Sequence, residues 1–245
     1  MQNRIFSTDS PKAIKAAGYG YINAIHYLAP AHLSGYNLCP HASAGCKALC
    51  LGWHSGQASM VSHGNAHNSV RASRVVKARR FIEDRQAYMA DVIRSIELLV
   101  AKARRADKKL CIRMNGSSDI AWEGIRVQGR TLFELFPNVD FVDYTKNPRR
   151  FDRSLPANYH LVFSRSETNE DTALKLLGRG VNVAAVFKDK PQVWKTFTVI
   201  DGDRHDLRQL DPRADRGFVI GLSPKGTKAR RDRSGFVITT ITACN

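Results

Sequence analysis

Three cysteines, Cys39, Cys46 and Cys50, lie close together in the stretch NLCPHASAGCKALCLGWHSG, residues 37–56. The chain has 245 residues and only five cysteines, so this segment holds more than half of its thiols. Thiolates are the ligands of iron–sulfur clusters, and three of them can hold three irons of a four-iron cluster. The fourth iron is then open to a small molecule. The pattern predicts a [4Fe-4S] site at these three cysteines.

Two other interpretations of the same cysteines stay open. His54 follows Cys50 with three residues between them, which completes a Cys3His set of the kind that binds structural zinc. Small thiols can also be buried simply as apolar side chains, and we expect this for Cys111 in the strand-like stretch KLCIRMN.

The cellular location that we expect from the sequence excludes disulfides. The N-terminal stretch MQNRIFSTDSPKAIKAAGYG has no apolar core of a signal peptide. No apolar run approaches the roughly 20 residues of a membrane span. We therefore expect a cytoplasmic protein without a membrane partner, in which thiols stay reduced and clustered cysteines point to metal or redox chemistry.

The charge of the chain predicts a nucleic-acid partner. There are 38 Lys and Arg against 22 Asp and Glu, a net charge of +16, which attracts polyanions. The excess is concentrated in the stretches VRASRVVKARR and PKGTKARRDRSG. Neither DNA nor RNA is favoured, and the oligomeric state is not indicated. The residues expected to contact phosphates are Arg71, Arg74, Lys77, Arg79, Arg80, Lys225, Lys228, Arg230 and Arg231.

The remaining pattern predicts one α/β domain over residues 1–245. Residues 68–107 are basic and helical, with Met89, Val92, Ile96, Leu99 and Val100 on one stripe. Short apolar strands and helices alternate over residues 109–238, which indicates a mainly parallel sheet. We predict a partial or open (β/α) barrel with an N-terminal cysteine-rich loop, and a doubly wound sheet as the second choice.

Polar segments follow the predicted strands, where α/β folds place functional groups. Asp119, Asp143, Lys146 and Asp203 are the candidate catalytic residues among them. Carboxylates bind Mg²⁺, so a metal-dependent nuclease is one alternative. Polar turns without a function are the other.

The ordered motifs NLCPHASAGCKALCLG, RMNGSSDIAWEG, VDFVDYTKNP, NYHLVFSRSETN and VIDGDRHDLRQLDP carry a family resemblance. The chain resembles a phage-encoded family named for its gene product, number eighty-eight. The resemblance implies the cytoplasm of a phage-infected or prophage-bearing bacterium.

The chain is also loosely similar to radical S-adenosylmethionine enzymes, in which three cysteines follow the first barrel strand and a Gly-rich segment follows the second. This likeness implies that Asn115, Gly116, Ser117 and Ser118 lie near S-adenosylmethionine, together with Asp119. The cysteine spacing of six and three differs from the usual three and two of that superfamily.

The expected function is therefore a phage-type iron–sulfur protein that binds or acts on nucleic acid. A nucleic-acid-modifying enzyme that uses S-adenosylmethionine is the sharper hypothesis. The alternatives are a zinc-stabilised DNA-binding protein without catalysis and the nuclease. The sequence does not decide whether the protein is an enzyme.

Overall fold

The computed structural model describes residues 4–54, 56–59 and 68–239. All strands within these ranges belong to one sheet, in the order β1-β2-β3-β4-β5-β6-β9-β8-β7, with β10 beside β6. Their bounds are β1 Phe6–Ser7, β2 Tyr21–His26, β3 Lys109–Arg113, β4 Asp140–Thr145, β5 Tyr159–Ser164, β6 Val183–Phe187, β7 Val193–Trp194, β8 Phe197–Asp201, β9 Val219–Leu222 and β10 Val237–Ile238.

The sheet is parallel in its interior and antiparallel at its margins. Strands β2 to β6, β9 and β8 are parallel to their neighbours, whereas β1 and β7 pair antiparallel. The prediction of an α/β domain is confirmed, and the mainly parallel sheet fits the interior only. Within the described ranges no pairing joins β1 to β7, so the sheet is open.

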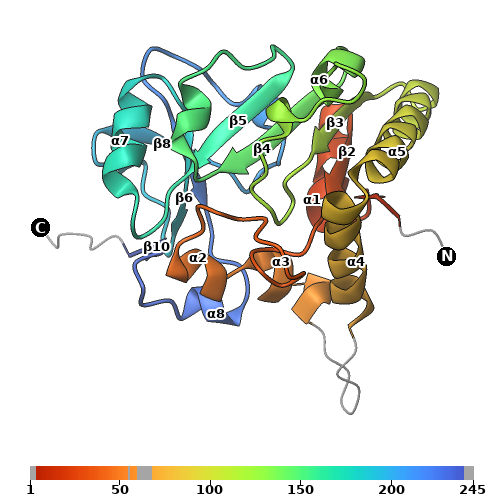
Figure 1. Cartoon of the computed structure of the whole chain (residues 1–245). Helices are drawn as coiled ribbons and strands as arrows, with labels where there is room; N and C mark the ends of the chain where they lie inside the picture. The colour runs from red at the N-terminus through yellow and green to blue at the C-terminus, as the bar shows by residue number, and fades with distance from the viewer. Residues whose placement is uncertain (1–3, 55, 60–67, 240–245) are drawn as a thin grey trace, which may run out of the picture.

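The helices are α1 Pro11–Ala16, α2 Ala44–Ala48, α3 Leu51–His54, α4 Ser69–Glu83, α5 Arg85–Arg105, α6 Leu132–Leu135, α7 Glu170–Gly178 and α8 Thr227–Arg230. Helices α5 and α7, from the connections between parallel strands, flank the sheet, whereas α2, α3 and α8 lie beyond the ends of the strands (Figure 1). Strands β2 to β6 follow one another in chain order, and right-handed crossovers then always return on the same side. A doubly wound sheet would reverse direction and cover both faces.

The predicted helical region 68–107 is two helices. Asp84 ends α4, and its carboxylate accepts a hydrogen bond from the Ala87 N–H at 3.4 Å to cap α5. None of the described helices is both long and apolar enough to span a membrane.

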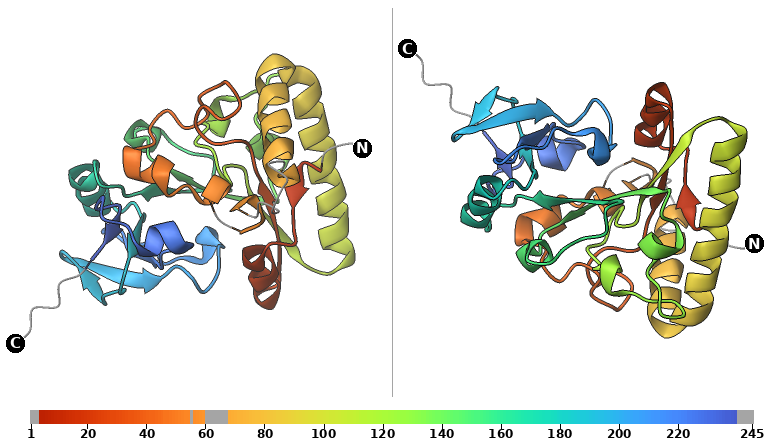
Figure 2. Two further views of the ribbon diagram at one scale, coloured as in Figure 1. Left: turned by 90° about the horizontal axis from the view of Figure 1, so that it is seen from below. Right: turned by 90° about the horizontal axis from the view of Figure 1, so that it is seen from above.

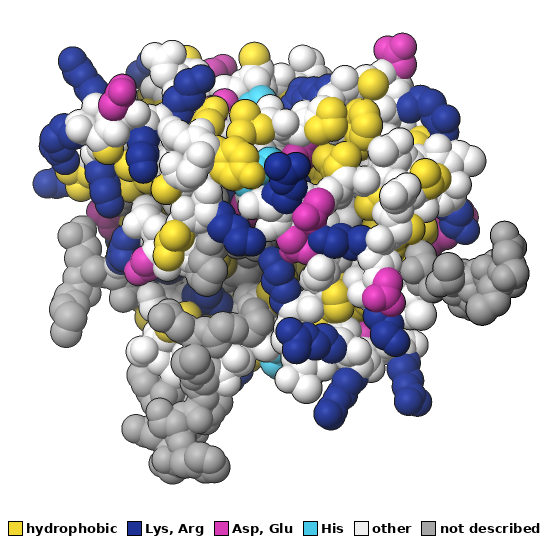
Figure 3. Space-filling model, turned by 180° about the vertical axis from the view of Figure 1, so that it is seen from behind, with side chains coloured by type: hydrophobic (Ala, Val, Ile, Leu, Met, Phe, Trp, Pro, Cys, Tyr) yellow, Lys and Arg dark blue, Asp and Glu magenta, His cyan; other side chains and the backbone are white. Residues whose placement is uncertain are grey.

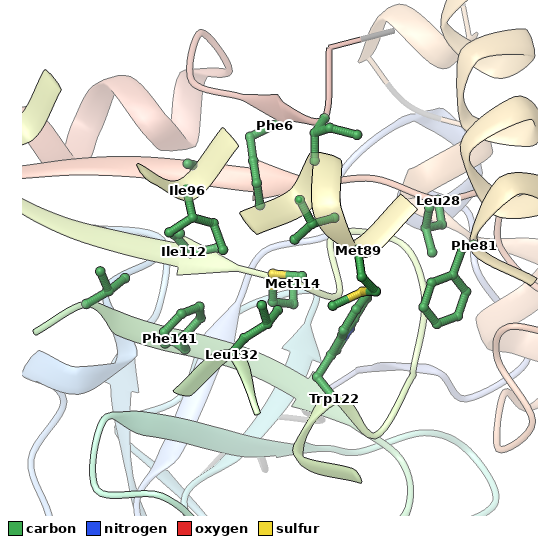
Figure 4. Close-up of a cluster of buried hydrophobic side chains, with 14 of the residues drawn as sticks. Phe6, Leu28, Phe81, Met89, Ile96, Ile112, Met114, Trp122, Leu132 and Phe141 are labelled. Carbon is green, nitrogen blue, oxygen red and sulfur yellow. The ribbon is translucent and has the colours of Figure 1, made fainter. Parts of the chain in front are cut away.

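The main core lies between α4, α5 and strands β2 to β4 (Figure 4). Met89, Val92 and Ile96 are buried in it, as the stripe predicts. Leu99 is partly buried, and Val100, at the rim of the stripe, is 38% exposed. The buried part of the stripe is thus narrower than predicted.

The opposite face of the sheet is covered by the segment of residues 201–212. Asp206, Leu207 and Arg208 of this segment are buried. Leu207 packs against Cys111 and Val142 on the sheet. The covering side chains thus come from the end of the stretch DGDRHD and from the residues directly after it.

Charged and aromatic contacts fix the same segment. The Arg113 guanidinium pairs with Asp206 at 3.1 Å, and the Tyr144 hydroxyl donates to the same carboxylate at 3.2 Å. The Lys15 amine of α1 donates to the Asp203 carbonyl of the same segment at 2.9 Å. Helix α1 thus lies beside this segment (Figure 2), and these contacts link the two ends of the open sheet.

Removal of the Asp206 carboxylate should strongly destabilise the fold. The Asp206 side chain is 2% exposed and that of Arg113 16%, so Asp206→Ala leaves a poorly solvated guanidinium without its anion. We expect a loss of about 3–5 kcal/mol in the free energy of unfolding, measured with urea. Asp215→Ala, at an exposed site, should change it by less than about 0.5 kcal/mol. Equal effects of the two variants would contradict this role.

Candidate metal centre

The cysteine loop, residues 37–56, follows β2 and runs past the carboxyl ends of the parallel strands (Figure 1). Ser43 begins α2, because its hydroxyl accepts the Cys46 N–H at 3.1 Å. Cys39 precedes this helix, Cys46 lies in it and Cys50 follows it. All three are partly exposed, whereas Cys111 is buried in β3 as predicted. The loop thus presents three reachable thiols at the functional edge of the sheet.

The three thiols are electrostatically coupled. Burial raises the pKa of Cys39 to about 12, and negative charge on Cys50 and Cys46 adds to the rise. Burial likewise raises the pKa of Cys50, with a contribution from Cys46. The raised pKa keeps these thiols protonated in the absence of a metal, and a bound cation would favour their thiolate forms. Metal binding and loss of the thiol protons are then linked.

A backbone N–H group points at the sulfur of Cys39. The Ala31 N–H donates to Cys39 Sγ at 3.3 Å. The backbone amides of Gly52 and Trp53 lie close enough to Cys50 to oppose the rise of its pKa, and the Trp53 N–H donates to the Cys50 carbonyl at 3.1 Å. Hydrogen bonds to sulfur favour the thiolate and are among the contacts that tune cluster potentials. The donor set and its surroundings therefore fit a thiolate-ligated metal group.

Within the described parts of the chain, no three His, Cys, Asp or Glu side chains are gathered as metal ligands. The thiols would have to turn toward a common centre when a metal binds. His54 adjoins the loop, and burial lowers its pKa, with help from the charges of Lys228 and Arg71. A neutral imidazole is the form that binds zinc, so the Cys3His alternative also fits.

The loop after β3, residues 115–119, packs directly against the cysteine loop. The Cys39 thiol donates to the Ser117 carbonyl at 3.6 Å, and the Ser117 hydroxyl donates to Leu28 O at 2.6 Å. A Cβ at Gly116 would lie 2.5 Å from the His26 carbonyl oxygen, so only glycine permits this approach. Gly116 and Ser117, which the resemblance places near a cofactor, are thus beside a cysteine.

Asn115 and Asp143 are buried in one hydrogen-bond network. The Asn115 N–H donates to Asp143 Oδ1 at 2.6 Å, and the Tyr159 hydroxyl donates to Oδ2 at 2.9 Å. Asn115 Oδ1 accepts from the Ser118 hydroxyl and the Ile120 N–H, each at 2.9 Å. These side chains shape the 115–119 loop. The roles of Asn115 and Ser118 as cofactor contacts and of Asp143 as a catalytic group stay predictions, beside the structural role that these hydrogen bonds give them.

Of the other candidate catalytic residues, Asp119 and Lys146 are joined by a hydrogen bond, and Asp203 has other partners. Asp119 pairs with Arg150 at 3.3 Å and accepts the Lys146 N–H at 2.8 Å. Lys146 Nζ donates to the Ser164 hydroxyl at 3.0 Å. Asp203 pairs with Lys190 and Lys225. Since the carboxylates have different partners, the arrangement gives no support to a nuclease that uses them together.

The surroundings of Asp203 make it a structural carboxylate. Its oxygens lie 3.1 Å from Lys190 Nζ and 3.3 Å from Lys225 Nζ, and the Ser223 N–H donates to it at 2.8 Å. Although burial opposes the effect, these donors and cations lower the pKa of Asp203.

The cations of α4 have partners within the protein, which are backbone carbonyls or a carboxylate. Arg71 donates to the Trp53 carbonyl at 2.9 Å, Arg74 donates to the Gly52 carbonyl, and Lys77 is 5% exposed. Arg79 donates to Ser34 O at 3.0 Å, and Arg80 pairs with Asp91 at 2.8 Å. The sequence pattern did not show that Arg71 and Arg74 have carbonyls of the cysteine loop as partners. Because Lys77 is buried, its amine is not on the surface where a nucleic acid could contact it.

The second basic stretch is on the surface. Lys225, Lys228, Arg230 and Arg231 are exposed. Lys225 pairs with Asp203, and the other three side chains have no ion-pair partner among the described residues. Lys and Arg side chains are also scattered over the face seen in Figure 3. The C-terminal stretch is therefore the better place for an anionic partner.

Glu167 is a site residue that the sequence did not reveal. Its carboxylate accepts the Gly45 N–H at 2.7 Å and the Ser43 hydroxyl at 2.8 Å, and so binds the start of α2. Glu167 is 122 residues away from Gly45 along the chain. The only signal was that the stretch SRSETN follows a strand and has polar side chains.

Glu167→Ala should loosen the cysteine loop. Two donors at the start of α2 lose their acceptor, which costs about 1–3 kcal/mol when they stay unsatisfied. We expect faster hydrogen exchange of the Gly45 amide, measured by NMR. Glu167→Gln keeps an acceptor oxygen and is the matched control. Unchanged exchange in Glu167→Ala would show that the contact does not hold the loop.

The pH dependence of stability should report Asp143. Burial raises its carboxyl pKa from 3.8 to about 7, although the Asn115 N–H opposes the rise. Between these values the native state binds the proton more tightly than the unfolded state, so this contribution to stability is lost as the pH rises.

Wild type should lose free energy of unfolding relative to Asp143→Asn from pH 4 to pH 7, by at most about 1.4 kcal/mol per pH unit. Urea denaturation across this range measures the difference. Asp171→Asn, at an exposed carboxylate, should show no such trend. Parallel profiles of wild type and Asp143→Asn would contradict the raised pKa.

The comparisons with known proteins identify a family. We found no match to the chain among curated proteins or among solved structures. Residues 4–240 match the model of the family described as Gene product 88. This match covers nearly the whole chain and agrees with the resemblance in its motifs. The protein therefore belongs to the Gene product 88 family.

Proposed function

We propose that this protein binds a [4Fe-4S] cluster through Cys39, Cys46 and Cys50 and acts on a nucleic acid or nucleotide. The single observation that carries the proposal is the position of three partly exposed thiols in one loop at the carboxyl edge of a parallel sheet. Three thiolates ligate three irons, and the fourth iron is left for another ligand.

The residues around the thiols have distinct roles in this proposal. The Ala31 N–H stabilises the Cys39 thiolate, and the backbone amides of Gly52 and Trp53 favour the thiolate of Cys50 by lowering its pKa. Glu167 fixes the start of the helix that contains Cys46. Arg71 and Arg74 hold the carbonyls of Trp53 and Gly52, which sets the path of the loop after Cys50.

S-adenosylmethionine is the ligand that we propose for the open position. The 115–119 loop follows the second parallel strand and contacts the cysteine loop, in the order that the resemblance to radical enzymes implies. Gly116 and Ser117 supply backbone groups and a side chain without bulk at this contact. When bound, the cluster supplies an electron, while the protein positions the ligands.

A nucleic acid or nucleotide partner is supported by charge. The net charge of +16 favours polyanions, and the free cations of the C-terminal stretch adjoin the cysteine loop. A phage or prophage setting, which the family resemblance implies, agrees with such a partner.

Anaerobic purification tests the cluster. We expect a brown protein with about four irons and four sulfides per chain and absorption near 400 nm from thiolate-to-iron charge transfer. Ala in place of Cys39, Cys46 or Cys50 should remove most of the iron. Cys111→Ala, at the buried cysteine of β3, should retain it and is the matched control.

Zinc gives a different result in the same experiment. A colourless protein with one zinc, which His54→Ala removes, would establish the Cys3His site and contradict the cluster. With the cluster present, cleavage of S-adenosylmethionine by the reduced protein tests the cofactor. A reduced cluster without cleavage would leave the protein an iron–sulfur protein of another kind and contradict that step.

A further inference from the structure

An open pocket lies between the cysteine loop and α8. One wall is formed by Ala48 and Leu49, which lie between Cys46 and Cys50 in the chain, and by His54. The other wall is formed by α8 and the residues after it, including Lys228, Arg231 and Arg233. A molecule in this pocket would touch the segment that connects two proposed metal ligands.

The charges of the pocket are unbalanced. Lys228, Arg231 and Arg233 are exposed, and none has an ion-pair partner within the described ranges. Asp232 is the carboxylate of the lining, and it is engaged elsewhere. Its oxygens accept the Ser234 N–H, the Ser234 hydroxyl and the Val237 N–H, at 3.1, 2.8 and 2.9 Å.

The net charge of the lining decides which ligand fits. Three cations and Asp232 give a net charge of +2, with His54 neutral. A phosphate monoester carries about −1.5 to −2 at pH 7, and a guanidinium binds phosphate through two parallel N–H groups. A phosphodiester inside a strand carries only one negative charge per nucleotide and balances this pocket less well.

We infer that the pocket between the cysteine loop and α8 binds a terminal phosphate, as part of a nucleotide or of the end of a nucleic-acid strand. The inference rests on the proposed function for what the ligand does there, because it places a phosphate-bearing substrate beside the proposed cluster. The binding site itself is argued from the pocket and its charges.

Binding of matched ligands to the full chain tests the inference. The probes are a nucleoside and its 5′-monophosphate, and one single-stranded oligonucleotide with and without a 5′-phosphate. We expect the phosphorylated member of at least one pair to bind about tenfold more tightly, as a charged hydrogen bond of about 1.5–3 kcal/mol implies. The pair with the larger preference identifies the source of the phosphate. Equal affinity within both pairs would overturn the inference.

The variants separate a site from general attraction of a basic surface. Arg231→Ala and Arg233→Ala should each reduce the preference for the phosphorylated ligand about tenfold. Arg230→Ala removes the same charge from the same segment, but Arg230 does not line the pocket, so it should keep the preference. An equal loss in Arg230→Ala would show diffuse attraction only and would overturn the site.

Iron analysis of the same preparations keeps this test apart from the proposed function. We expect Arg231→Ala and Arg233→Ala to retain the iron of the wild type while they lose the phosphate preference. A wild type without iron that still prefers the phosphorylated ligand would contradict the cluster and support the pocket. A wild type that contains iron but shows no preference for the phosphorylated ligand would support the cluster and contradict the pocket.

Discussion

The buried pair of Asn115 and Asp143 is the contact on which the candidate site depends. Asn115 is 2% exposed and Asp143 is fully buried, so water cannot replace their hydrogen bonds. Burial of an unsatisfied carboxylate or amide is costly, and the pair is therefore held in one arrangement. That arrangement fixes the turn after β3. The turn brings Gly116 against the His26 carbonyl and the Ser117 carbonyl to the Cys39 thiol.

Among its described residues, the cysteine loop contains two short helices, α2 and α3, and it is held by groups from other elements. Arg71 and Arg74 reach it from α4, Glu167 from the loop after β5, and Ser117 from the loop after β3. Much of the positive charge near the thiols is thereby used to bind backbone carbonyls. The basic composition thus serves two purposes, because internal guanidinium groups brace the loop and the exposed C-terminal cations remain free for a ligand.

The fold was largely predictable because its signals are local. Apolar strands alternate with helices, and this pattern gave the parallel interior of the sheet and the position of the cysteine loop after β2. The short strands β1, β7 and β10 were not predicted, because a strand of two residues is too short to show an alternating pattern. The sequence also did not reveal that Asp206, among the aspartates after β8, is matched by Arg113 and Tyr144 from the sheet.

The sequence by itself determined the chemistry that is available: three thiols in one loop, a glycine-bearing turn after a strand and two basic stretches. These follow from residue types and short spacings. Only the tertiary structure decided which of these groups are free. It buried Asn115, Asp143 and Lys77, joined Arg71 and Arg74 of α4 to carbonyls of the cysteine loop and left the C-terminal cations beside that loop. Such pairings join residues far apart in the chain, and burial and partner choice depend on packing that no local pattern contains.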